Sequence, residues 1–412
     1  MLIGFSFKNF MSFYEENIFT LKASSDTKFR ELNTVQTDYD ELIKSAFIFG
    51  ANGSGKTNFI KALNWMMNFV LVDLLTQSRM ASQTPYFGFN TVAKKKPTAF
   101  ETQFIVNNIL YEYGFELLNG EVNKEYLRQK KDKRMTPVFE RVSPDFKDIS
   151  FTGSMMDNVK DLAKNTRRDN LFLYWANIGN NQVAIDIYRW FANIQMFEMN
   201  DAIGMLTHTI GYLEKTDDGK SKVLNLLNKA DINILDFAVE TTQRSSGRGV
   251  QLLTQRKLYG ENWKEVGSLP AHIDFESSGT RKMFEIAGPI IDALEKGKVI
   301  FIDEIDSRLH PLLVRFLVMM FNSISNNPQN AQLICSTHDV LLLDEDIRRD
   351  QVYFTEKNEY GVSELYALTD FKGIRKNSKL LKQYLVGSFG ATPNIRQHLM
   401  LTSSEEGFDG SE

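Results

Sequence analysis

A glycine-rich segment that ends in lysine and threonine is the part of the chain best suited to chemistry. Residues 43–57 read IKSAFIFGANGSGKT, and the pattern G-x-x-x-x-G-K-[ST] is matched by Gly50, Gly55, Lys56 and Thr57. Glycines let successive backbone N–H groups turn toward one anion. The lysine adds a positive charge for the β and γ phosphates, and the threonine hydroxyl can bind Mg²⁺. This pattern predicts a phosphate-binding loop for a nucleoside triphosphate.

The elements on either side of this segment favour the same interpretation. A short apolar strand precedes the loop, and residues 58–75 have apolar side chains at helical spacing, namely Phe59, Ile60, Leu63, Met66, Met67, Val70, Leu71, Leu74 and Leu75. A loop at a helix N-terminus suits a phosphate because the helix dipole favours negative charge there. A plain turn is the alternative for an isolated match, and it fits poorly between a strand and a helix. The predicted nucleotide-binding residues are Asn52, Gly53, Ser54, Gly55, Lys56, Thr57 and Asn58.

Two acids end a second apolar segment far downstream. Residues 298–304 read KVIFIDE, which predicts a buried parallel strand with carboxylates at its C-terminal end. Ligands of open α/β sheets bind at this end of the strands. We expect Asp303 to help hold Mg²⁺, and Glu304 to orient and deprotonate the attacking water. The alternative is a strand that leads into an ordinary acidic turn.

A histidine follows a third apolar strand. Residues 331–340 read AQLICSTHDV, so His338 falls at the C-terminal end of this strand and can contact the γ-phosphate and the attacking water. A structural histidine or a helix cap is the alternative. The other four histidines lack the spacing of metal ligands, so no zinc or iron site is predicted.

A polar turn and an amphipathic helix lie between these motifs. Residues 275–294 read FESSGTRKMFEIAGPIIDAL, in which Ser277 or Ser278 can cap a helix that Pro289 kinks or restarts. The same turn offers N–H groups and hydroxyls to a phosphate. The local residues favour an ordinary cap and a phosphate contact about equally.

Composition limits the remaining possibilities. The chain has 412 residues, of which 42% are hydrophobic, so it can build one large domain or two. Its net charge of −4 provides no overall electrostatic attraction for nucleic acid. A single cysteine, Cys335, excludes an intrachain disulfide and fits a reducing compartment. The N-terminus lacks the features of a signal peptide, and the longest apolar helix is too short to cross a bilayer. We therefore expect a soluble cytoplasmic protein with no membrane partner.

The order of these motifs resembles that of the ABC-type ATPase heads of SMC, RecF and OLD-like proteins. It resembles most the AAA ATPases of bacterial abortive-infection (AbiL-like) phage-defence operons. The similarity covers residues 1–120 and 265–397 and rests on MLIGFSFKNFMSF, GANGSGKTN, ESSGT, FIDEIDSRLHP, CSTHDVLLLD and the segments RRDQVYFTEKNEYGVSELYAL and YLVGSFGATPNI.

This resemblance implies a Mg²⁺-dependent ATPase whose two heads associate head-to-tail with ATP between them. The phosphate loop of one copy would then face the signature of the other, Ser277, Ser278 and Gly279, and Asp306 would cross the interface in the D-loop. The signature here is Glu-Ser-Ser-Gly-Thr in place of Leu-Ser-Gly-Gly-Gln, so the serine that contacts the γ-phosphate stays open. Gln103, in FETQF, is the candidate for the metal-binding glutamine of the Q-loop.

The expected fold is an α/β P-loop ATPase head of ABC type, built from residues 1–120 and 265–400, with a mostly helical insertion at 121–264 and a disordered tail at 402–412. Residues 111–127 predict a hairpin around an Asn-Gly turn. Helices are expected at 180–213 and 220–235, and a polar loop at 240–250. The basic run KEYLRQKKDKR predicts an exposed turn, or a phosphate-backbone contact, through Lys124, Arg128, Lys130, Lys131, Lys133 and Arg134.

Two functions compete beyond ATP hydrolysis. The resemblance implies a sensor that regulates a separate toxic effector, a Toprim-like (RloB-type) nuclease encoded beside it. Because only about seventy residues follow His338, we expect no nuclease domain of the Toprim kind in this chain. The acidic residues 343–346 are expected to cap or turn a helix. The alternative is a RecF-like or SMC-like ATPase of DNA repair that binds nucleic acid directly through the basic run.

Overall fold

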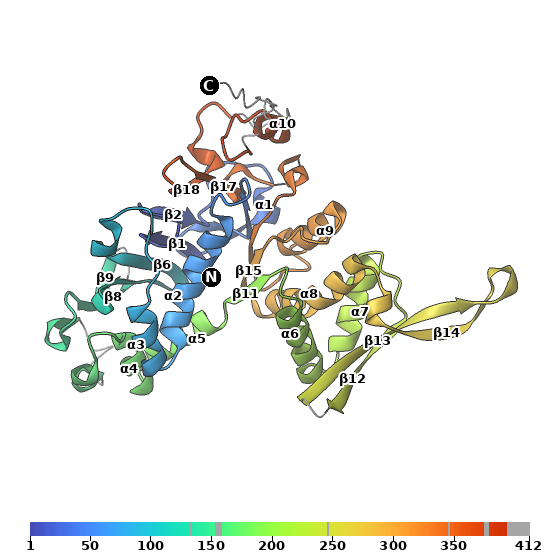
Figure 1. Cartoon of the computed structure of the whole chain (residues 1–412), viewed down its shortest axis with the longest axis horizontal. Coiled ribbons are helices and arrows are strands. Elements are labelled where there is room, and N and C mark those ends of the chain that lie inside the picture. Colours follow the sequence, from blue (N-terminus) through green and yellow to red (C-terminus); the bar gives the residue numbers. More distant parts are fainter. Residues whose placement is uncertain (132–133, 153–158, 245–246, 345–346, 375–378, 394–412) are drawn as a thin grey trace, which may run out of the picture.

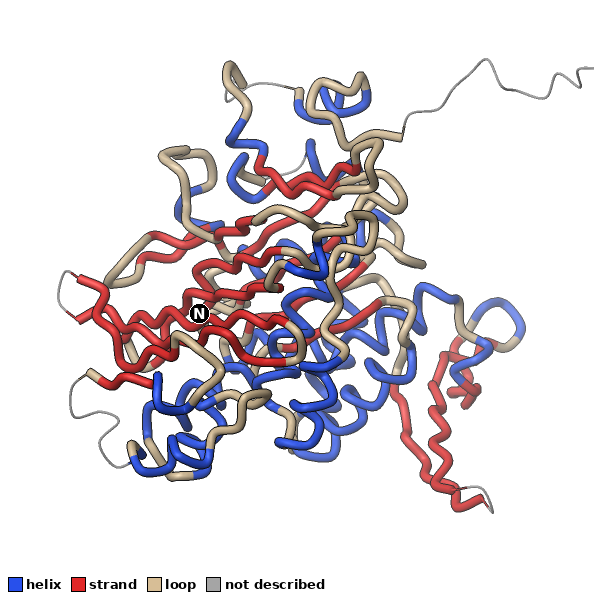
Figure 2. The backbone as a smooth tube through the Cα atoms, turned by 60° about the vertical axis from the view of Figure 1, so that its left-hand side comes forward, coloured by secondary structure: helices blue, strands red, loops and turns tan. Residues whose placement is uncertain are grey.

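The computed structural model describes residues 1–131, 134–152, 159–244, 247–344, 347–374 and 379–393. Two large β-sheets of different kinds lie on either side of one long helix, α2 (Lys56–Leu71), and a small third sheet projects from the body (Figures 1 and 2).

The first large sheet is the parallel one that carries the predicted chemistry. Its first five strands are parallel and the sixth is antiparallel at the edge. Every residue of the three central strands is buried, as expected for parallel strands covered on both faces. The α/β prediction is therefore confirmed. The strand order is β11 (Gln195–Glu198), β15 (Val299–Asp303), β16 (Gln332–Ser336), β5 (Ser45–Phe49), β17 (Val352–Lys357) and β18 (Ser363–Ala367).

Alternate side chains of these strands feed two separate cores. Ile48, Phe301 and Ile334 pack with α2 on one face. Phe47, Ile302 and Cys335 pack on the other face with α8 (Ser278–Lys296) and α9 (Pro311–Asn322). The motif-bearing strands are thus held from both sides, and their C-terminal ends have little freedom to move.

The second large sheet is antiparallel and packs on the opposite side of α2. Phe59 of α2 lies 6.2 Å from the ring of Phe5 and 5.2 Å from that of Phe19, between centroids. The sheet order is β10 (Ile149–Phe151), β9 (Arg134–Arg141), β8 (Glu121–Lys131), β7 (Ile109–Leu118), β6 (Thr98–Val106), β1 (Leu2–Lys8) and β2 (Asn17–Thr20).

The predicted boundary at residue 121 is wrong, because it cuts this sheet. The Asn119–Gly120 turn joins β7 to β8, which confirms the predicted hairpin, and β8 to β10 extend the same sheet to residue 151. The basic run is likewise not an exposed turn: residues 124–131 form most of strand β8, and Arg134 begins β9. Lys133 lies outside the described residues.

Only the part of the predicted insertion between β10 and residue 236 is mainly helical, which corrects the prediction of a mostly helical segment at 121–264. The expected helix at 180–213 is divided into α5 (Gln182–Ala192) and α6 (Ala202–Lys215) by β11, and α7 (Gly219–Lys229) follows. The expected loop at 240–250 belongs to the small antiparallel sheet, apart from residues 245–246, which lie outside the described part. This sheet consists of β12 (Asp236–Arg244), β13 (Gly247–Tyr259) and β14 (Glu265–His272). Its β13–β14 end extends into solvent and exposes Trp263 (Figure 1).

Two predicted helices differ in detail from the structure. The helix expected to reach residue 75 ends at Leu71, and Asp73 caps a new helix, α3 (Leu74–Ser82), by accepting the N–H groups of Leu75 and Thr76. α8 passes through Pro289 as one helix, with no restart. A proline leaves the carbonyl four residues earlier without its helical donor. The Thr209 hydroxyl donates to that carbonyl, of Glu285 (2.7 Å), and accepts from the Gly288 N–H (3.0 Å).

Further short elements are α1 (Arg30–Asn33), β3 (Thr34–Gln36), β4 (Glu41–Ile43), α4 (Phe172–Ile178) and α10 (Leu380–Leu385). A 3₁₀ helix (Val340–Asp344) contains the first two acidic-segment residues, and 345–346 lie outside the described part. The tail at 402–412 also lies outside it. In the part of the chain that the structure describes, no helix is long and apolar enough to cross a membrane.

Candidate nucleotide-binding site

The phosphate loop follows β5 directly and leads into α2 at Lys56. Close packing requires glycine at its two ends. A Cβ on Gly50 would lie 2.5 Å from the Thr355 carbonyl oxygen, and one on Gly55 would lie 2.7 Å from the Ser363 Oγ. Gly55 also has φ of +126°, which side-chain-bearing residues rarely adopt. The neighbouring strands β17 and β18 therefore pack closely against the two ends of the loop.

Lys56 folds back onto its own loop. Its ammonium donates to the carbonyl oxygens of Gly50 (2.8 Å) and Ala51 (3.1 Å). Burial lowers the pKa of Lys56, and the carboxylates of Asp303, Glu304 and Asp306 act in the opposite direction. The three acids thus lie close enough to act electrostatically on this lysine, which brings the upstream and downstream motifs together.

The other loop residues divide into supporting and open positions. Ser54 is buried and shares a hydrogen bond of 2.6 Å with the Thr355 hydroxyl, and the Asn58 amide donates to the Ser12 Oγ (2.8 Å). Asn52 and Gly53 are exposed, and nothing lies within 4 Å of the place where a Gly53 Cβ would stand. Asn52 and Gly53 are therefore free to meet a nucleotide, whereas Ser54 and Asn58 hold the loop in shape.

Ser336, the last residue of β16, holds both acids at the end of β15. Its hydroxyl donates to the Asp303 carboxylate and accepts the Glu304 N–H (2.8 Å). Glu304 has a left-handed backbone with φ of 55°, which turns the chain sharply after the buried strand. Two neighbouring acids are thereby directed differently, as separate metal and water roles would require.

His338 and Asp306 are linked within the same chain. The Asp306 carboxylate accepts the Thr337 hydroxyl (2.8 Å) and the His338 N–H (3.1 Å). Desolvation lowers the pKa of the His338 imidazole, and the Lys56 ammonium lowers it further, while the carboxylates of Asp306, Glu304 and Asp303 raise it. His338 is therefore close to the loop lysine, as the order of the strands predicts. Asp306 contacts its own histidine strand here.

The signature residues lie at the start of α8. Ser277 caps this helix by accepting the Thr280 N–H at 3.0 Å, and Ser277 and Ser278 are exposed. Gly279 lies near the Arg308 carbonyl, where an added Cβ would make only an ordinary contact at 3.5 Å. Between described residues, no hydrogen bond joins this turn to the phosphate loop of the same chain. The signature is thus separate from the loop and available to another molecule.

Gln103 does not join the site, which corrects its predicted role as a metal ligand. Its amide donates to Glu112 (2.9 Å) on the neighbouring strand β7. It pairs with Gly4 of β1, and the Leu2 N–H of that strand donates to the Gln332 side chain (2.7 Å) at the start of β16. Gln103 therefore lies toward the amino ends of the parallel strands, and the phosphate loop is at their carboxyl ends.

Residues at the end of β11 were missed by the sequence reasoning. A cavity of about 340 Å³ joins Thr57 and Lys61 of α2 to Asp303, Glu198 and Asp201. Glu198 is aligned with Asp303 across the β11–β15 pair. The only signal in the sequence was an acid at the end of a four-residue strand, inside a segment that reads as helical.

The donor atoms around this cavity suit Mg²⁺. The ion needs few protein ligands, because substrate phosphates and water supply most of its oxygen ligands. The Thr57 hydroxyl and the Asp303 carboxylate can supply the remaining ones. The described residues contain no group of three or more His, Cys, Asp or Glu side chains that could hold a metal by themselves. The oxygen atoms of Thr57 and Asp303 fit a Mg²⁺ ion whose other ligands are phosphate oxygens and water.

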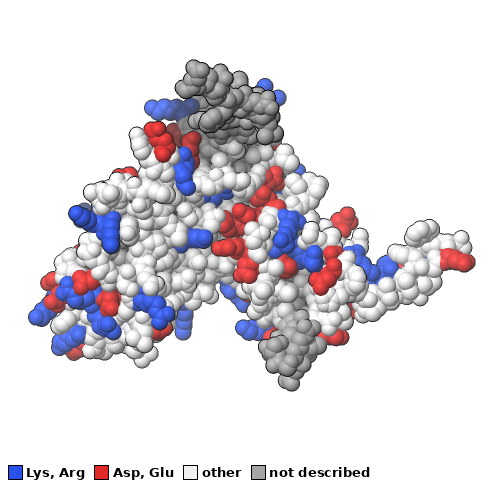
Figure 3. Space-filling model, in the orientation of Figure 1, with Lys and Arg blue, Asp and Glu red and all other residues white. Residues whose placement is uncertain are grey.

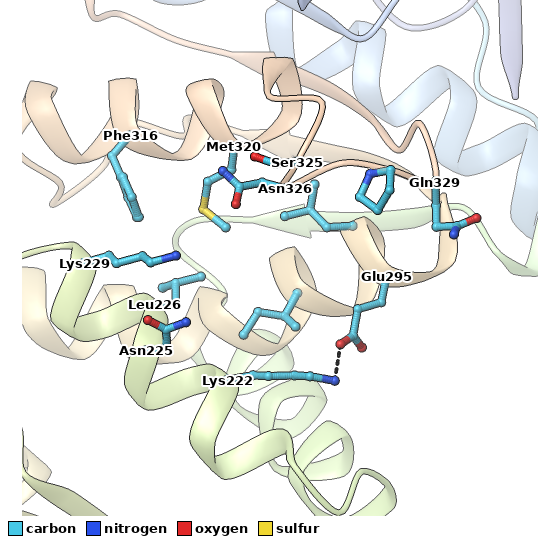
Figure 4. Close-up of a pocket in the computed structure, with 13 residues that line it drawn as sticks. Lys222, Asn225, Leu226, Lys229, Glu295, Phe316, Met320, Ser325, Asn326 and Gln329 are labelled. Atoms are coloured by element: carbon cyan, nitrogen blue, oxygen red, sulfur yellow. Dashed lines mark ion pairs between the residues drawn. The ribbon is translucent and has the colours of Figure 1, made fainter.

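A larger cavity lies elsewhere among the described residues. It measures about 570 Å³ and lies between α7, α8 and α9, with Leu226, Phe316 and Met320 among its apolar lining (Figure 4). Lys222 and Glu295 form an ion pair at its edge. No residue of the phosphate loop lines it, so cavity size alone would misplace the nucleotide site.

Comparison with known proteins agrees with this geometry. The protein-family model described as "AAA domain, putative AbiEii toxin, Type IV TA system" matches residues 45–344, from β5 to the 3₁₀ helix after His338. The chain belongs to this AAA-domain family. The prediction of a P-loop AAA ATPase is therefore confirmed, and the closer resemblance to AbiL-like proteins stays a prediction.

No curated protein matches the sequence of this AAA-domain chain. Solved structures similar to it include the SMC head bound to the C-terminal winged-helix domain of ScpA. That match has 13% identity and a TM-score of 0.42, and covers 89% of this chain and 97% of the other. Another is cbiO1 from Clostridium perfringens, part of the ABC transporter complex cbiONQ. It has 13% identity and a TM-score of 0.29, and covers 82% of this chain and 88% of the other.

Proposed function

We propose that this protein binds and hydrolyses Mg·ATP at the phosphate loop and uses the cycle to control a separate toxic effector nuclease in defence against phage. The observation that carries the ATPase part is the convergence of Lys56, the acids after β15 and His338 at one edge of the parallel sheet. Three separate parts of the chain meet there, and each supplies a group that phosphoryl transfer needs.

The chemistry assigned to these residues follows from their positions. Loop N–H groups and the Lys56 ammonium bind the phosphates, so Lys56 must exchange its two carbonyl contacts for phosphate oxygens. Thr57 and Asp303 would hold Mg²⁺, which when bound would neutralise charge on the phosphate oxygens. Glu304 accepts the proton of the attacking water, and His338 contacts the γ-phosphate.

We infer that two copies close head-to-tail around the nucleotide. Ser277, Ser278 and Gly279 are separate from their own phosphate loop, and the exposed start of α8 can receive a γ-phosphate from the other copy. Asp306 would exchange its contact with His338 for one across the interface when the heads close. Hydrolysis would then release the pair.

The effector role is supported by the family description, which refers to a toxin and a type IV toxin–antitoxin system. In this proposal the chain is the ATP-driven regulator, and a Toprim-like (RloB-type) nuclease is the toxic partner. A host pull-down with Glu304→Gln protein and ATP tests this part. Recovery of a stoichiometric nuclease supports it, and recovery of nucleic acid alone contradicts it.

Direct DNA binding of the RecF or SMC kind is the less favoured alternative. Its only sequence support was the basic run, and two of those cations are paired: Arg128 contacts Glu112 (2.7 Å) and Glu140 (3.7 Å), and Lys124 contacts Glu116 (3.9 Å). Positive and negative residues are also interspersed on the face shown in Figure 3. A DNA duplex attracts proteins that present unpaired positive charge along one face.

Two substitutions test the ATPase directly. Lys56→Ala should weaken binding of a fluorescent ATP analogue at least ten-fold, because the loop loses its only cation. Glu304→Gln should retain binding and lower kcat by at least a hundred-fold, because the amide cannot accept the proton. Unchanged affinity of the first variant, or unchanged turnover of the second, would refute the assignment of that residue.

A further inference from the structure

The loop between β11 and α6 contacts both acids of the proposed site, although it carries no recognisable motif. The Met199 N–H donates to the Asp303 carbonyl oxygen at 3.1 Å. The next residue, Asn200, donates from its side-chain Nδ2 to the Glu304 Oε2, also at 3.1 Å. One short loop therefore reaches the backbone of the first acid and the carboxylate of the second.

The hydrogen bonds of Asn200 define which end of its amide faces Glu304. The Ser307 hydroxyl donates to the Asn200 Oδ1 at 3.3 Å. Because the amide oxygen is engaged there, the amide turns its NH₂ group toward the carboxylate. An ionised carboxylate has no proton to donate, so the NH₂ group is its matching partner. Because Ser307 follows Glu304 by three residues, Asn200 closes a small ring of contacts around the turn that presents Glu304.

This loop is anchored from its other side as well. Met199 is buried, and its carbonyl accepts the Lys282 ammonium at 2.6 Å. Lys282 is itself only 2% exposed and lies one turn beyond Ser278 in α8. A side chain positions its partner well only when its own support is rigid. Asn200 meets that condition, because strand β15 and helix α8 both hold the residue before it.

We propose that Asn200 is a positioning residue for the water-activating carboxylate of Glu304. By engaging Oε2, it leaves Oε1 as the oxygen that accepts the proton. The proposal rests on the role of Glu304 in the proposed function. Asn200 need not touch the nucleotide, so its contribution falls on the chemical step and leaves ATP binding unaffected.

The first test is steady-state ATP hydrolysis by the full chain with Mg²⁺. Asn200→Ala should lower kcat about ten-fold, the usual effect of losing one hydrogen bond to a charged group, and change KM less than two-fold. Asn200→Asp has the same shape but cannot donate and repels Glu304, so its loss should be at least as large. Asn193→Ala is the matched control, because this exposed asparagine lies at the other end of β11 and should retain wild-type kcat.

The second test asks whether Asn200 acts through Glu304. Single-turnover rates of Glu304→Gln and of the double variant Glu304→Gln/Asn200→Ala should agree within two-fold, because the group that Asn200 positions is already lost. The proposal would be overturned if the rate loss of the double variant equalled the product of the two single losses. Full activity of Asn200→Asp or a wild-type kcat for Asn200→Ala would also overturn it.

The catalytic role of Glu304 and the positioning role of Asn200 would be refuted by different results. If Glu304→Gln turns over as fast as wild type, the catalytic assignment fails and Asn200 loses its role with it. If Glu304→Gln is slow while Asn200→Ala is fast, only the inference about Asn200 fails. A thermal unfolding midpoint within about 2 °C of wild type excludes misfolding as the cause of a lost rate.

Discussion

At the scale of single residues, the site depends on groups that serve two purposes. The Ser336 hydroxyl donates to the Asp303 carboxylate and accepts the Glu304 N–H, and the Lys56 ammonium donates to a carbonyl of its own loop. Binding therefore exchanges existing hydrogen bonds for new ones, and the net gain is smaller than the number of phosphate contacts suggests.

Gly55→Ala tests whether the loop tolerates a side chain. The new Cβ would clash with Ser363 and force an unfavourable φ, so we expect a loss of about 1–3 kcal/mol in unfolding free energy and weaker nucleotide binding. Thermal unfolding and titration with a fluorescent ATP analogue measure the two effects. Gly88→Ala is the control, since that position is open. Equal behaviour of the two variants would contradict the packing argument.

At the scale of elements, α8 connects the signature to the rest of the molecule and depends on one threonine of α6. Thr209→Val keeps the size of the side chain but leaves the Glu285 carbonyl and the Gly288 N–H without their partner. We expect a loss of about 1–3 kcal/mol in unfolding free energy, measured by chemical denaturation.

The exposed Thr207→Val on the same helix should have little effect. Adding Pro289→Ala to Thr209→Val should recover part of the loss, because the alanine N–H again satisfies Glu285. No recovery would mean that Thr209 matters for packing alone.

The junction between the small sheet and the signature should respond to acid. A bidentate bond from Arg256 holds the pKa of Glu276 below its usual 4.5, and Thr254 adds a second donor. An acid whose pKa is lowered by folding stabilises the protein above its unfolded pKa, and this contribution is lost as pH falls through the folded value. Glu276→Gln should therefore cost about 1–2 kcal/mol at pH 7 and progressively less below pH 4.5, as followed by urea unfolding. A penalty independent of pH would contradict the ion pair.

The elements that were predicted correctly are those whose signal is local. The strand before the phosphate loop, strand β15 and strand β16 are continuous apolar runs next to motif residues. The hydrophobic pattern and the motif therefore predict the same strand in each case. Residues 240–250, which include parts of β12 and β13, were predicted as a polar loop because their sequence, ETTQRSSGRGV, contains almost no apolar residue to indicate a strand. Strand β11 has only four residues and lies between two helices.

The site was predictable to the same extent. Lys56, Asp303, Glu304 and His338 follow strands or open a helix in recognisable patterns, and the structure brings them together. Asn200 could not be found, because its partner lies more than a hundred residues away and nothing in its own neighbourhood marks it. Gln103 was misplaced for the related reason that strand composition does not reveal which end of a strand reaches the site.

At the scale of the whole molecule, a head-to-tail pair predicts complementation between defective copies. Lys56→Ala and Ser278→Arg should each abolish hydrolysis when alone. In a mixed pair, one of the two sites combines the native loop of one copy with the native signature of the other. An equal mixture should recover about a quarter of wild-type activity, since half the pairs are mixed and each has one complete site.

Lys56→Ala alone, at the same total protein concentration as the mixture, provides the baseline for that assay. Recovery at the same level from two different Lys56 variants, or no recovery at any mixing ratio, would exclude composite sites. Light scattering of Glu304→Gln with ATP should show a doubled mass that Ser278→Arg prevents.

The buried position of Cys335 makes the native thiol unreactive toward labelling reagents. Its thiol is fully buried in β16, and burial raises its pKa well above the usual value, so little thiolate forms near neutral pH. Maleimide probes should therefore pass over the native chain, and a cysteine introduced by Trp263→Cys at the exposed end of the small sheet should react alone. Fluorophores or spin labels can thus be attached without first removing a native residue, and the distance between two labels would test the proposed head-to-tail pair during ATP hydrolysis.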